Sequence, residues 1–342
     1  MKAIVCTRYG ATEDVVELRQ MPKPTVGPQD VLIAAHAASV NPIDYKIQRG
    51  DLKVIMRLSF PFVMGFDVSG IVVETGAQVT HFKPGDAVFA RVDTNRFGTF
   101  AEFVATDAQF VAHKPAQLSH AEAAALPLAA LTAWQALYEK AHLKQGQKVL
   151  IHAGSGGVGS LAIQLAKHVE AQVATTTSTA NVDLVKSLGA DVVIDYKTQK
   201  FEDVLQDYDA VFETLGGANQ EKSFRVLKPG GVLVSIVGIP TAAWARQHGL
   251  PFFMPWLFDF MNRNNNRLAR KHQVRFDALM MTPNGKQLEQ IAILAEEGKL
   301  KPVIDRVFPL EQTQQALLHS QSGRSRGKIV IQIAPASGDA NT

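Results

Sequence analysis

The chain has 342 residues, of which 46% are hydrophobic and 20% are charged, a composition typical of a globular protein with two domains. Its net charge of +3 is too small to indicate nucleic acid as a partner. No apolar run approaches the roughly 18 residues that a membrane-spanning helix needs. The only cysteine, Cys6, excludes an intrachain disulfide and a cysteine-rich zinc site. Because only a short apolar stretch precedes Arg8, we expect no secretion signal and a cytoplasmic location.

The first hundred residues are predicted to form a compact and mostly antiparallel β domain. Short runs rich in β-branched and aromatic residues are separated by Pro and Gly turns such as KPGD. The predicted strands are 31–37, 68–76, 86–92 and 100–107. The alanine- and leucine-rich segment 121–141 is then predicted to be helical, with Pro127 at a helix start or a kink.

From residue 148 the sequence alternates between strands and helices of about ten residues, which predicts a parallel sheet with helices on both faces. The turn KPGG at 228–231 precedes the last of these strands. The predicted strands are 148–153, 171–177, 191–195, 210–216 and 232–238, and the helices are 161–169, 181–190 and 218–227. After them we expect a helix at 284–298, a strand at 301–308, a helix at 311–320, a strand at 328–333 and a loose tail.

A glycine-rich loop, G-x-G-x-x-G at Gly154, Gly156 and Gly159, lies between the strand at 148–153 and a helix. In that context the pattern indicates a dinucleotide site. The first glycine forms the tight turn, the second lets backbone N–H groups approach a pyrophosphate, and the third allows close packing of helix and strand. The alternative is a strand–helix turn that binds nothing.

The end of the next strand bears on which nicotinamide cofactor is used. An NAD site usually has Asp or Glu about 20 residues after the first glycine, but residues 173–178 read VATTTS and contain no acid. We therefore expect NADPH, with Thr177 and Ser178 as hydroxyl donors to its 2′-phosphate and Tyr196 closing the pocket. No arginine follows, and Asn181 stands where a lysine would help. The alternative is that these hydroxyls only cap the next helix.

Together these features resemble the medium-chain dehydrogenase/reductase superfamily, and within it the zinc-independent quinone oxidoreductase and enone (alkenal) reductase branch. The resemblance covers about residues 2–333 and includes SVNPIDYKIQRG, PFVMGFDVSGIVVETG, RFGTFAEFV, LPLAALTAWQAL and GKLKPVIDRVFPL. It implies an α/β fold with a GroES-like β-rich catalytic domain and a Rossmann domain with a doubly wound parallel sheet. We expect the catalytic domain at 1–125, completed by 283–335, the Rossmann domain at 126–282, and a tail at 336–342.

The resemblance also implies that no metal is bound. Zinc relatives have a cysteine where this chain has Asn41, and a His–Glu pair where it has Phe66 and Asp67. The segment aligned with their structural zinc lobe contains no cysteine. Asp44, His36 and His81 remain as scattered metal-ligand types, which more often are ordinary surface or core residues.

Without zinc, hydrogen-bond donors must stabilise the enolate that forms when hydride reaches the β-carbon of an enone. The resemblance places the NPIDYK segment beside the nicotinamide. Asn41 is then a candidate for holding the carboxamide or the substrate oxygen, Lys46 for donating to the enolate, and Tyr45 for the proton donor. The alternatives are that Lys46 pairs with Asp44 and that Tyr45 only packs.

By position, the resemblance assigns further cofactor contacts to three parts of the chain. These are a threonine near the domain junction, the phosphate loop, and residues near strand ends. They are Thr132, Ser155, Gly156, Gly157, Val158, Gly216, Val237, Gly238 and Lys328.

Residues 239–273 depart from a compact family member, because an aromatic-rich stretch at 250–262 is followed by a basic one at 262–275. The segment is interpreted as a core helix with a solvated basic face, as a flap over a hydrophobic substrate, or as a surface for anionic membranes. The strand expected at 274–281 matches one that pairs across a two-fold axis in the superfamily, so a homodimer is expected. We predict reduction of quinones or α,β-unsaturated carbonyls. The rivals are an enoyl-thioester reductase and a silent NADPH-binding regulator.

Overall fold

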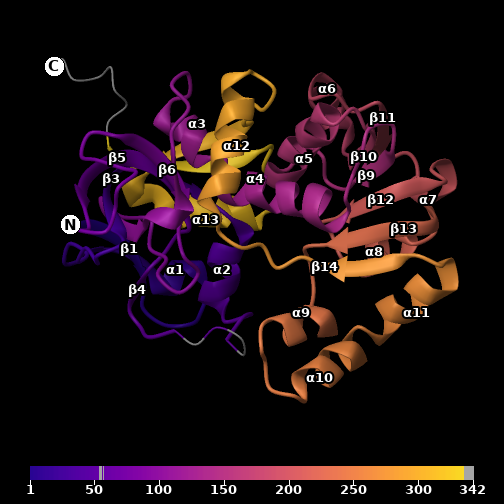
Figure 1. Cartoon of the computed structure of the whole chain (residues 1–342), viewed down its shortest axis with the longest axis horizontal. Helices are drawn as coiled ribbons and strands as arrows, with labels where there is room; N and C mark the ends of the chain where they lie inside the picture. The colour runs from indigo at the N-terminus through magenta and orange to yellow at the C-terminus, as the bar shows by residue number, and fades with distance from the viewer. Residues whose placement is uncertain (54–55, 57, 335–342) are drawn as a thin grey trace. The chain divides into compact units, whose positions relative to one another are not determined.

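The computed structural model describes residues 1–53, 56 and 58–334, so the tail expected at 336–342 lies outside the described residues. The chain divides into two compact units, each described here by itself (Figure 1). Unit 1 comprises Met1–Leu131 and Thr282–Thr342, and unit 2 comprises Thr132–Met281.

Unit 1 is built on a seven-stranded sheet, and all its strand pairs are antiparallel except β15 with β16, as the β-rich sequence predicts. Strand β3 lies at its centre, where valine and isoleucine side chains form a buried cluster with those of β5 and β6. The order is β15-β16-β3-β5-β6-β8, with β7 also paired to β3. The strands are β3 Asp30–Val40, β5 Asp67–Thr75, β6 Ala87–Arg91, β7 Phe103–Asp107, β8 Val111–His113, β15 Ile304–Pro309 and β16 Lys328–Gln332.

A second, three-stranded sheet in unit 1 was not predicted. Its strands are β1 Lys2–Cys6, β2 Val16–Gln20 and β4 Phe62–Val63, in the order β2-β1-β4. Strand β2 has one buried and four exposed residues, so it lacks the alternation that signals a strand in sequence. The helices of unit 1 are α1 Thr12–Val15, α2 Pro42–Arg49, α3 His120–Ala124, α12 Gly285–Glu296 and α13 Thr313–Gln321.

The segment 121–141 is helical as predicted, and the structure divides it at Pro127. Helix α3 ends at Ala124, and Pro127 begins α4 (Pro127–Trp134), which is one of the two places expected for that proline. A π-helical stretch, Gln135–Lys140, follows. Proline cannot donate the helical hydrogen bond that a continuous helix would need at 127, which explains the break.

Unit 2 contains a six-stranded parallel sheet in the order β11-β10-β9-β12-β13-β14. The chain builds outward from β9 in one direction, then returns to the other side of β9 and builds the opposite way. Right-handed crossovers therefore place the two sets of helices on opposite faces. The strands are β9 Lys148–Ile151, β10 Gln172–Thr177, β11 Val192–Asp195, β12 Tyr208–Glu213, β13 Leu227–Ser235 and β14 Arg275–Ala278, and the helices are α5 Gly157–His168, α6 Val182–Ser187, α7 Phe201–Val204 and α8 Gly217–Ser223.

The turn predicted at 228–231 lies inside the bounds of β13. Leu227 pairs with Tyr208 and Val232 with Ala210, so the four residues between them have no partner on β12. Gly230 has a φ of 82°, a conformation that glycine adopts without a steric cost. Residues 228–231 therefore form a bulge within β13 and not a turn that precedes the strand.

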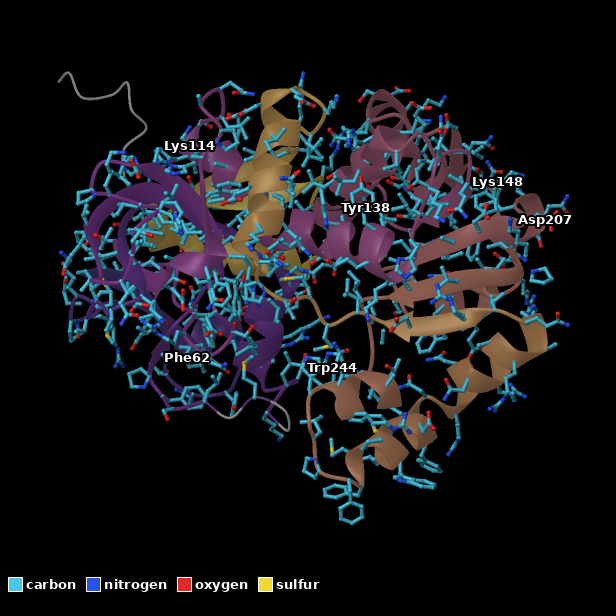
Figure 2. All side chains as sticks on the ribbon, in the orientation of Figure 1. Phe62, Lys114, Tyr138, Lys148, Asp207 and Trp244 are labelled. Atoms are coloured by element: carbon cyan, nitrogen blue, oxygen red, sulfur yellow. The ribbon has the colours of Figure 1, made fainter. Side chains whose placement is uncertain are left out.

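Between β13 and β14 the chain forms three helices at one edge of unit 2 (Figure 1). They are α9 Ala242–Gln247, α10 Met254–Met261 and α11 Arg263–His272, and Trp244 projects from α9 (Figure 2). Ala269 of α11 is buried in the cluster that lines the sheet beneath it. Strand β14 is the outermost strand of the sheet, as predicted for this segment.

Candidate functional site

The direction of the strand order reverses at β9, and the loop between β9 and α5 carries the three glycines. Open parallel sheets bind ligands at such a switch point. A Cβ on Gly154 would lie 2.1 Å from Oγ1 of Thr175, and one on Gly159 would lie 2.3 Å from the carbonyl oxygen of Ala153. The first and third glycines therefore allow α5 to approach the sheet. At Gly156 the nearest atom would be 3.3 Å away, so this glycine is not required by packing.

The N-terminus of α5 has the features of an anion site. Its N-cap residue, Gly156, offers no side chain to accept from the first backbone N–H groups, and the first turn contains no acidic residue. Lys167 and His168 lie in the last turn, at the negative end of the helix dipole. The free N–H donors and the positive dipole end fit the pyrophosphate of a dinucleotide.

The polar residues predicted to hold the cofactor's 2′-phosphate lie together at the end of β10. The Ser155 hydroxyl oxygen accepts from Oγ1 of Thr177 at 3.0 Å and from Nδ2 of Asn181 at 3.1 Å. Asn181 also donates to Ser178 at 3.3 Å, and its own Oδ1 is buried without a partner. Tyr196 is exposed after β11. The cluster contains donors and no carboxylate.

An acid that the sequence reasoning missed ends the next strand. Asp195 closes β11, and its carboxylate accepts from Thr179 Oγ1 at 2.6 Å and from the backbone N–H of Lys197 at 3.0 Å. The hydrogen bond from Thr179 is the main reason why the pKa of Asp195 lies below its usual value. A carboxylate engaged in this way fixes the loop after β11.

The ends of β12 and β13 bring two predicted cofactor residues together. A Cβ on Gly216 would lie 3.0 Å from Cγ1 of Val237, and Gly216 has a φ of 75°. Oε1 of Glu213 accepts from the backbone N–H groups of Leu215 at 2.6 Å and of Gly216 at 2.9 Å. Nothing would obstruct a Cβ on Gly238. Glu213, fully buried, therefore holds the turn that carries Gly216.

Glu213 belongs to a buried polar network that the sequence did not reveal. Nε2 of His152 lies 2.9 Å from Oγ of Ser223 and 3.6 Å from Oε2 of Glu213. Nδ1 of His152 lies 3.1 Å from Oγ1 of Thr176. Burial lowers the pKa of His152, so the ring is neutral and has one donor and one acceptor nitrogen. The network ties β9, β10 and β12 together beneath the glycine loop.

In unit 1, Asn41 is the N-cap of α2 and lies in a second buried polar network. Its Nδ2 donates to Oδ2 of Asp67 at 2.8 Å, and its Oδ1 accepts from Nζ of Lys328. Asp67 also accepts from Oγ of Ser39 at 2.9 Å and from the backbone N–H of Leu128 at 2.8 Å. The predicted residues Asn41 and Lys328 are thus in contact, although 287 positions separate them.

The Lys328 ammonium group lies inside unit 1, with 4% of the residue exposed. It donates to the carbonyl oxygen of Val40 at 3.1 Å and lies 3.5 Å from Oδ2 of Asp67. Burial lowers its pKa, while the nearby carboxylates of Asp67 and Asp44 oppose that shift. The ammonium group balances buried negative charge, and its assignment as a cofactor contact stays a prediction.

Asp44 is buried on the first turn of α2, and its Oδ2 accepts from the backbone N–H of Asn41 at 2.7 Å. Burial raises its pKa to about 7, partly offset by that hydrogen bond. Its Oδ1 is buried without a partner. Arg91 is also buried nearby, and desolvation lowers its pKa to about 10. A carboxyl in this position can hold a proton near neutral pH.

The catalytic candidates Tyr45 and Lys46 lie on the same helix. Tyr45 is half-buried, packs against the core of unit 1 and has the Arg49 guanidinium 5.2 Å from its ring centroid. Burial raises its pKa. Within the described part of the chain, no hydrogen bond or ion pair joins the side chain of Lys46 to Asp44 or to another residue. Thr132, the remaining predicted contact, is buried in α4.

Among the described residues, no three His, Cys, Asp or Glu side chains are grouped so that they could hold a metal ion. The ring of His36 stacks on that of His120 at 4.4 Å, and Asp44 caps a helix, so two of the scattered candidates have structural contacts. That the protein uses no metal stays a prediction.

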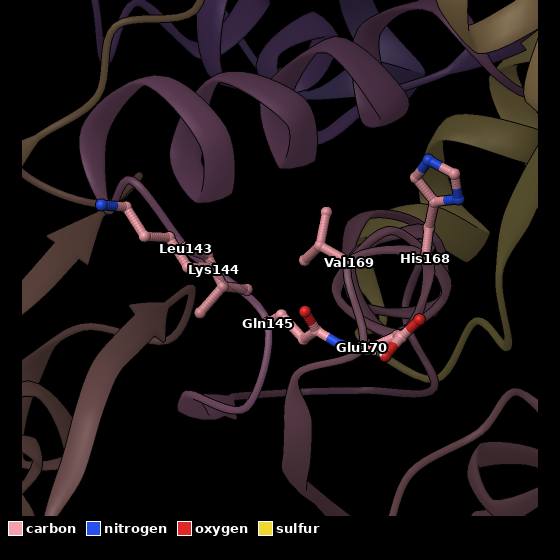
Figure 3. Close-up of a pocket in the computed structure, with 6 residues that line it drawn as sticks. All are labelled: Leu143, Lys144, Gln145, His168, Val169 and Glu170. Atoms are coloured by element: carbon pink, nitrogen blue, oxygen red, sulfur yellow. Dashed lines mark hydrogen bonds between the residues drawn. The ribbon is translucent and has the colours of Figure 1, made fainter.

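A surface pocket of about 390 Å³ lies in unit 2 where the end of α5 meets the loop before β9 (Figure 3). It contains none of the residues predicted to bind cofactor or substrate. Its lining residues are Leu143, Lys144, Gln145, His168, Val169 and Glu170.

Two family models match the chain. Residues 27–116 match the alcohol dehydrogenase GroES-like domain, and residues 188–331 match a model described as zinc-binding dehydrogenase. The first lies within unit 1, whereas the second extends from the residue after α6 into β16. No helix among the described residues is long and apolar enough to cross a membrane.

Relatives that match nearly the whole of this chain include reductases. The 2-methylene-furan-3-one reductase of Solanum lycopersicum is 38% identical, over 98% of this chain and 80% of its own length. The chloroplastic NADPH-dependent alkenal/one oxidoreductase of Arabidopsis thaliana is 35% identical, with the same coverage of 98% and 80%. The quinone oxidoreductase structure from Coxiella burnetii superposes with a TM-score of 0.84 at 34% identity, over 98% of this chain and 99% of that one.

Proposed function

Because this chain belongs to the zinc-independent quinone oxidoreductase and enone reductase branch of the medium-chain dehydrogenase/reductase superfamily, it is an oxidoreductase of quinones or α,β-unsaturated carbonyls, and we propose that NADPH is its reductant. The cofactor, when bound, supplies a hydride to the substrate. The observation that supports NADPH is the cluster of Ser155, Thr177 and Asn181, which offers hydroxyl and amide groups at the end of β10 and no carboxylate. A carboxylate there would repel a 2′-phosphate.

The chain's own contribution begins with the backbone N–H groups of the first turn of α5, which would hold the pyrophosphate. Glu213 fixes the turn at Gly216, which together with Val237 and Gly238 would orient the nicotinamide end. Both parts lie on the rigid edge of one sheet. This arrangement would position the reductant without movement of the loops.

For the substrate oxygen, we propose Lys46 as the donor that stabilises the developing enolate. Its ammonium group has no partner within the described residues, whereas both polar atoms of the Asn41 side chain are already engaged. Tyr45 is the second candidate, and its packing against the core supports a structural role. A donor aimed at the oxyanion lowers the barrier because charge develops there in the transition state.

The test is a comparison of NADPH and NADH oxidation with 1,4-quinones, 2-alkenals and an enoyl-CoA. We expect NADPH preference and turnover of a quinone or an enone. Lys46→Ala should lower kcat by about 10- to 100-fold with KM for NADPH unchanged. Arg49→Ala, on the exposed face of the same helix, should leave kcat unchanged. NADH preference would contradict the cofactor proposal. NADPH binding without turnover of any substrate would favour a regulatory role.

We also propose a homodimer that forms through β14. This strand is the outermost of its sheet and is paired only with β13 among the described strands. A free edge of this kind can pair with a second copy across a two-fold axis. Sedimentation velocity should give a dimer, and Phe276→Pro on β14 should give a monomer. The single buried thiol, Cys6, supports the proposal of a reducing, cytoplasmic compartment, which cell fractionation would test.

A further inference from the structure

Helix α10 has apolar residues on an exposed face as well as on a buried one. Pro255 and Phe258 point into unit 2, with Asn262 following one turn later. The opposite face and the residues before the helix are exposed, by 88% for Phe252, 78% for Trp256 and 63% for Phe260. Phe253, Leu257 and Met261 extend the same surface. Figure 2 shows ring side chains pointing from this helix away from unit 2. Exposed aromatic patches of this extent mark interaction surfaces.

The surface is held in place by the chain itself. Nδ2 of Asn262 donates to the carbonyl oxygens of Pro240 at 3.0 Å and Phe258 at 3.1 Å, which joins the end of α10 to the segment before α9. On α11, Asn265 accepts from Gln220 at 2.9 Å and Asn264 donates to Glu221 at 2.8 Å, so this helix is anchored to α8. The rings therefore project from a rigid base.

Helix α11 places a cluster of positive charge beside the rings. Its exposed cations are Arg263, Arg267, Arg270 and Lys271, with Arg275 just beyond. The segment 250–275 contains one acid, Asp259, against these five cations, whereas the whole chain has only three more Lys and Arg than Asp and Glu. The rest of the chain is therefore close to neutral, and its excess positive charge is concentrated here.

The rings and the cations form one continuous surface. The Arg263 guanidinium lies 4.6 Å from the ring centroid of Phe260, so the end of α10 and the start of α11 meet through a cation–π contact. Oδ1 of Asp259 accepts from Nδ2 of Asn266 at 3.1 Å. We refer to the surface formed by residues 252–271 of α10 and α11 as the α10–α11 surface.

We propose that the α10–α11 surface docks the protein on an anionic lipid bilayer. Aromatic side chains insert at the boundary between headgroups and acyl chains, and arginine and lysine are attracted to anionic headgroups. A second copy of the chain fits less well, because a two-fold interface through this surface would bring the same four cations against each other. Docking of this kind needs no spanning helix and does not depend on the reaction that the enzyme catalyses.

The test is co-sedimentation of the full chain with vesicles of phosphatidylcholine, with and without phosphatidylserine. We expect binding to the anionic vesicles that falls as salt is added. The fluorescence of Trp256 should shift to shorter wavelength on binding, because its ring leaves water. Binding is measured without cofactor or turnover, so failure of the proposed reaction would leave this result unaffected.

Two sets of variants separate the contributions. The apolar set should abolish binding, and the charge set should lower the partition coefficient by about tenfold or more. The apolar set is Phe252→Ser, Trp256→Ser and Phe260→Ser, and the charge set is Arg267→Gln, Arg270→Gln and Lys271→Gln. Matched controls on exposed residues elsewhere should bind as the wild type does. They are Val204→Ser with Val307→Ser, and Lys186→Gln with Lys200→Gln and Lys286→Gln.

Three results would overturn the proposal. Wild-type protein could stay in the supernatant with anionic vesicles, or the apolar set could bind them as strongly as the wild type. Sedimentation velocity could also show that the apolar set converts a dimer into a monomer, which would make the α10–α11 surface an interface between copies. Circular dichroism of each variant shows whether it is folded.

Discussion

Helices α2 and α5 begin in opposite ways, although each starts where a strand ends in a glycine- or proline-containing turn. At α2 the chain's own side chains bind the helix start, since Oδ2 of Asp44 accepts from the backbone of Asn41, and Asn41 is hydrogen-bonded to Asp67 and Lys328. At α5 the N-cap is Gly156 and the first turn contains no acid.

The difference shows that the N-terminus of a helix can either stabilise the fold or bind a ligand. At a helix start that buried side chains cover, the polar atoms have lost their water, so the hydrogen bonds between them are needed for the stability of the unit. A helix start left open over a glycine loop is available to an anionic ligand. In this chain the closed start lies in unit 1 and the open one in unit 2.

The largest effect on stability is expected from removing the lysine of the buried polar network at the start of α2. Lys328→Met removes the ammonium group that lies 3.5 Å from Oδ2 of Asp67, so the buried carboxylate keeps its hydrogen bonds but loses this ion pair. We expect the free energy of unfolding to fall by about 3–5 kcal/mol. Urea unfolding followed by circular dichroism measures this.

The matched control for Lys328 is a lysine in an exposed ion pair. Lys299 contacts Glu297 with both side chains about half exposed, so Lys299→Met should change the free energy of unfolding by less than about 0.5 kcal/mol. Equal losses for the two variants would show that the buried network does not stabilise unit 1.

A pH-dependent effect on stability is expected from Asp44, in the first turn of α2. Burial places the pKa of Asp44 at about 7 in the folded protein, above the value of an aspartate in the unfolded chain. The folded state therefore favours the protonated form, and the stability that Asp44 contributes is present in acid and lost between about pH 4 and pH 7. In Asp44→Asn the loss of stability from pH 5 to pH 8 should be smaller than in the wild type, by about 2–4 kcal/mol.

Urea unfolding of wild type and Asp44→Asn at the two pH values tests this. Asp86→Asn is a control, because Asp86 is a partly buried aspartate whose pKa is lowered by its hydrogen bond from Lys83 and which therefore stays ionised across this range. If the wild type and Asp44→Asn lost stability in parallel, Asp44 would not be protonated in the folded protein at neutral pH.

A smaller effect on stability is expected from adding a methyl group at Gly159, the third glycine of the loop. A Cβ on Gly159 would lie 2.3 Å from the carbonyl oxygen of Ala153, so α5 would have to move away from the sheet in Gly159→Ala. We expect a loss of about 1–3 kcal/mol in the free energy of unfolding, together with weaker NADPH binding. Gly146→Ala is a poor control because Gly146 has a φ of 76°, whereas in Gly156→Ala the new Cβ would lie 3.3 Å from the carbonyl oxygen of Ala153 and requires a much smaller shift. Unchanged stability in Gly159→Ala would contradict the packing role of the third glycine.

Most of the fold could be predicted from sequence because its signals are local. Alternating strands and helices after residue 148 indicate the parallel sheet, and the loop from Gly154 to Gly159 gives the site for a phosphate. The resemblance of whole segments adds the family. Strand β2 was not predicted, since nearly all of its residues are exposed. The helix start at Pro127 was predicted, but the change to a π-helix at Gln135–Lys140 was not.

The polar networks could not be predicted, because they join residues that are far apart in the chain. Nothing near Lys328 in the sequence indicates that its ammonium group meets Asn41 and Asp67. The aromatic residues in and before α10 were difficult for a different reason, because their local composition fits both a buried and an exposed helix. The composition of residues 250–262 resembles a core helix, and only the three-dimensional structure shows that four of the rings are more than half exposed.

The most direct test of the contrast between the two helix starts is Gly156→Asp, which gives α5 an acidic N-cap of its own. Gly156 has a φ of −81°, which aspartate adopts without strain, and the nearest atom to its Cβ would be 3.3 Å away. Gly156→Ala adds the same Cβ without the charge. The measurement is NADPH affinity by isothermal titration calorimetry. We predict an affinity at least about 100-fold lower in Gly156→Asp than in Gly156→Ala, although the acidic N-cap should make Gly156→Asp the more stable of the two by about 0.5–2 kcal/mol. Equal affinity of the two folded variants for NADPH would contradict the assignment of the phosphate site to the start of α5.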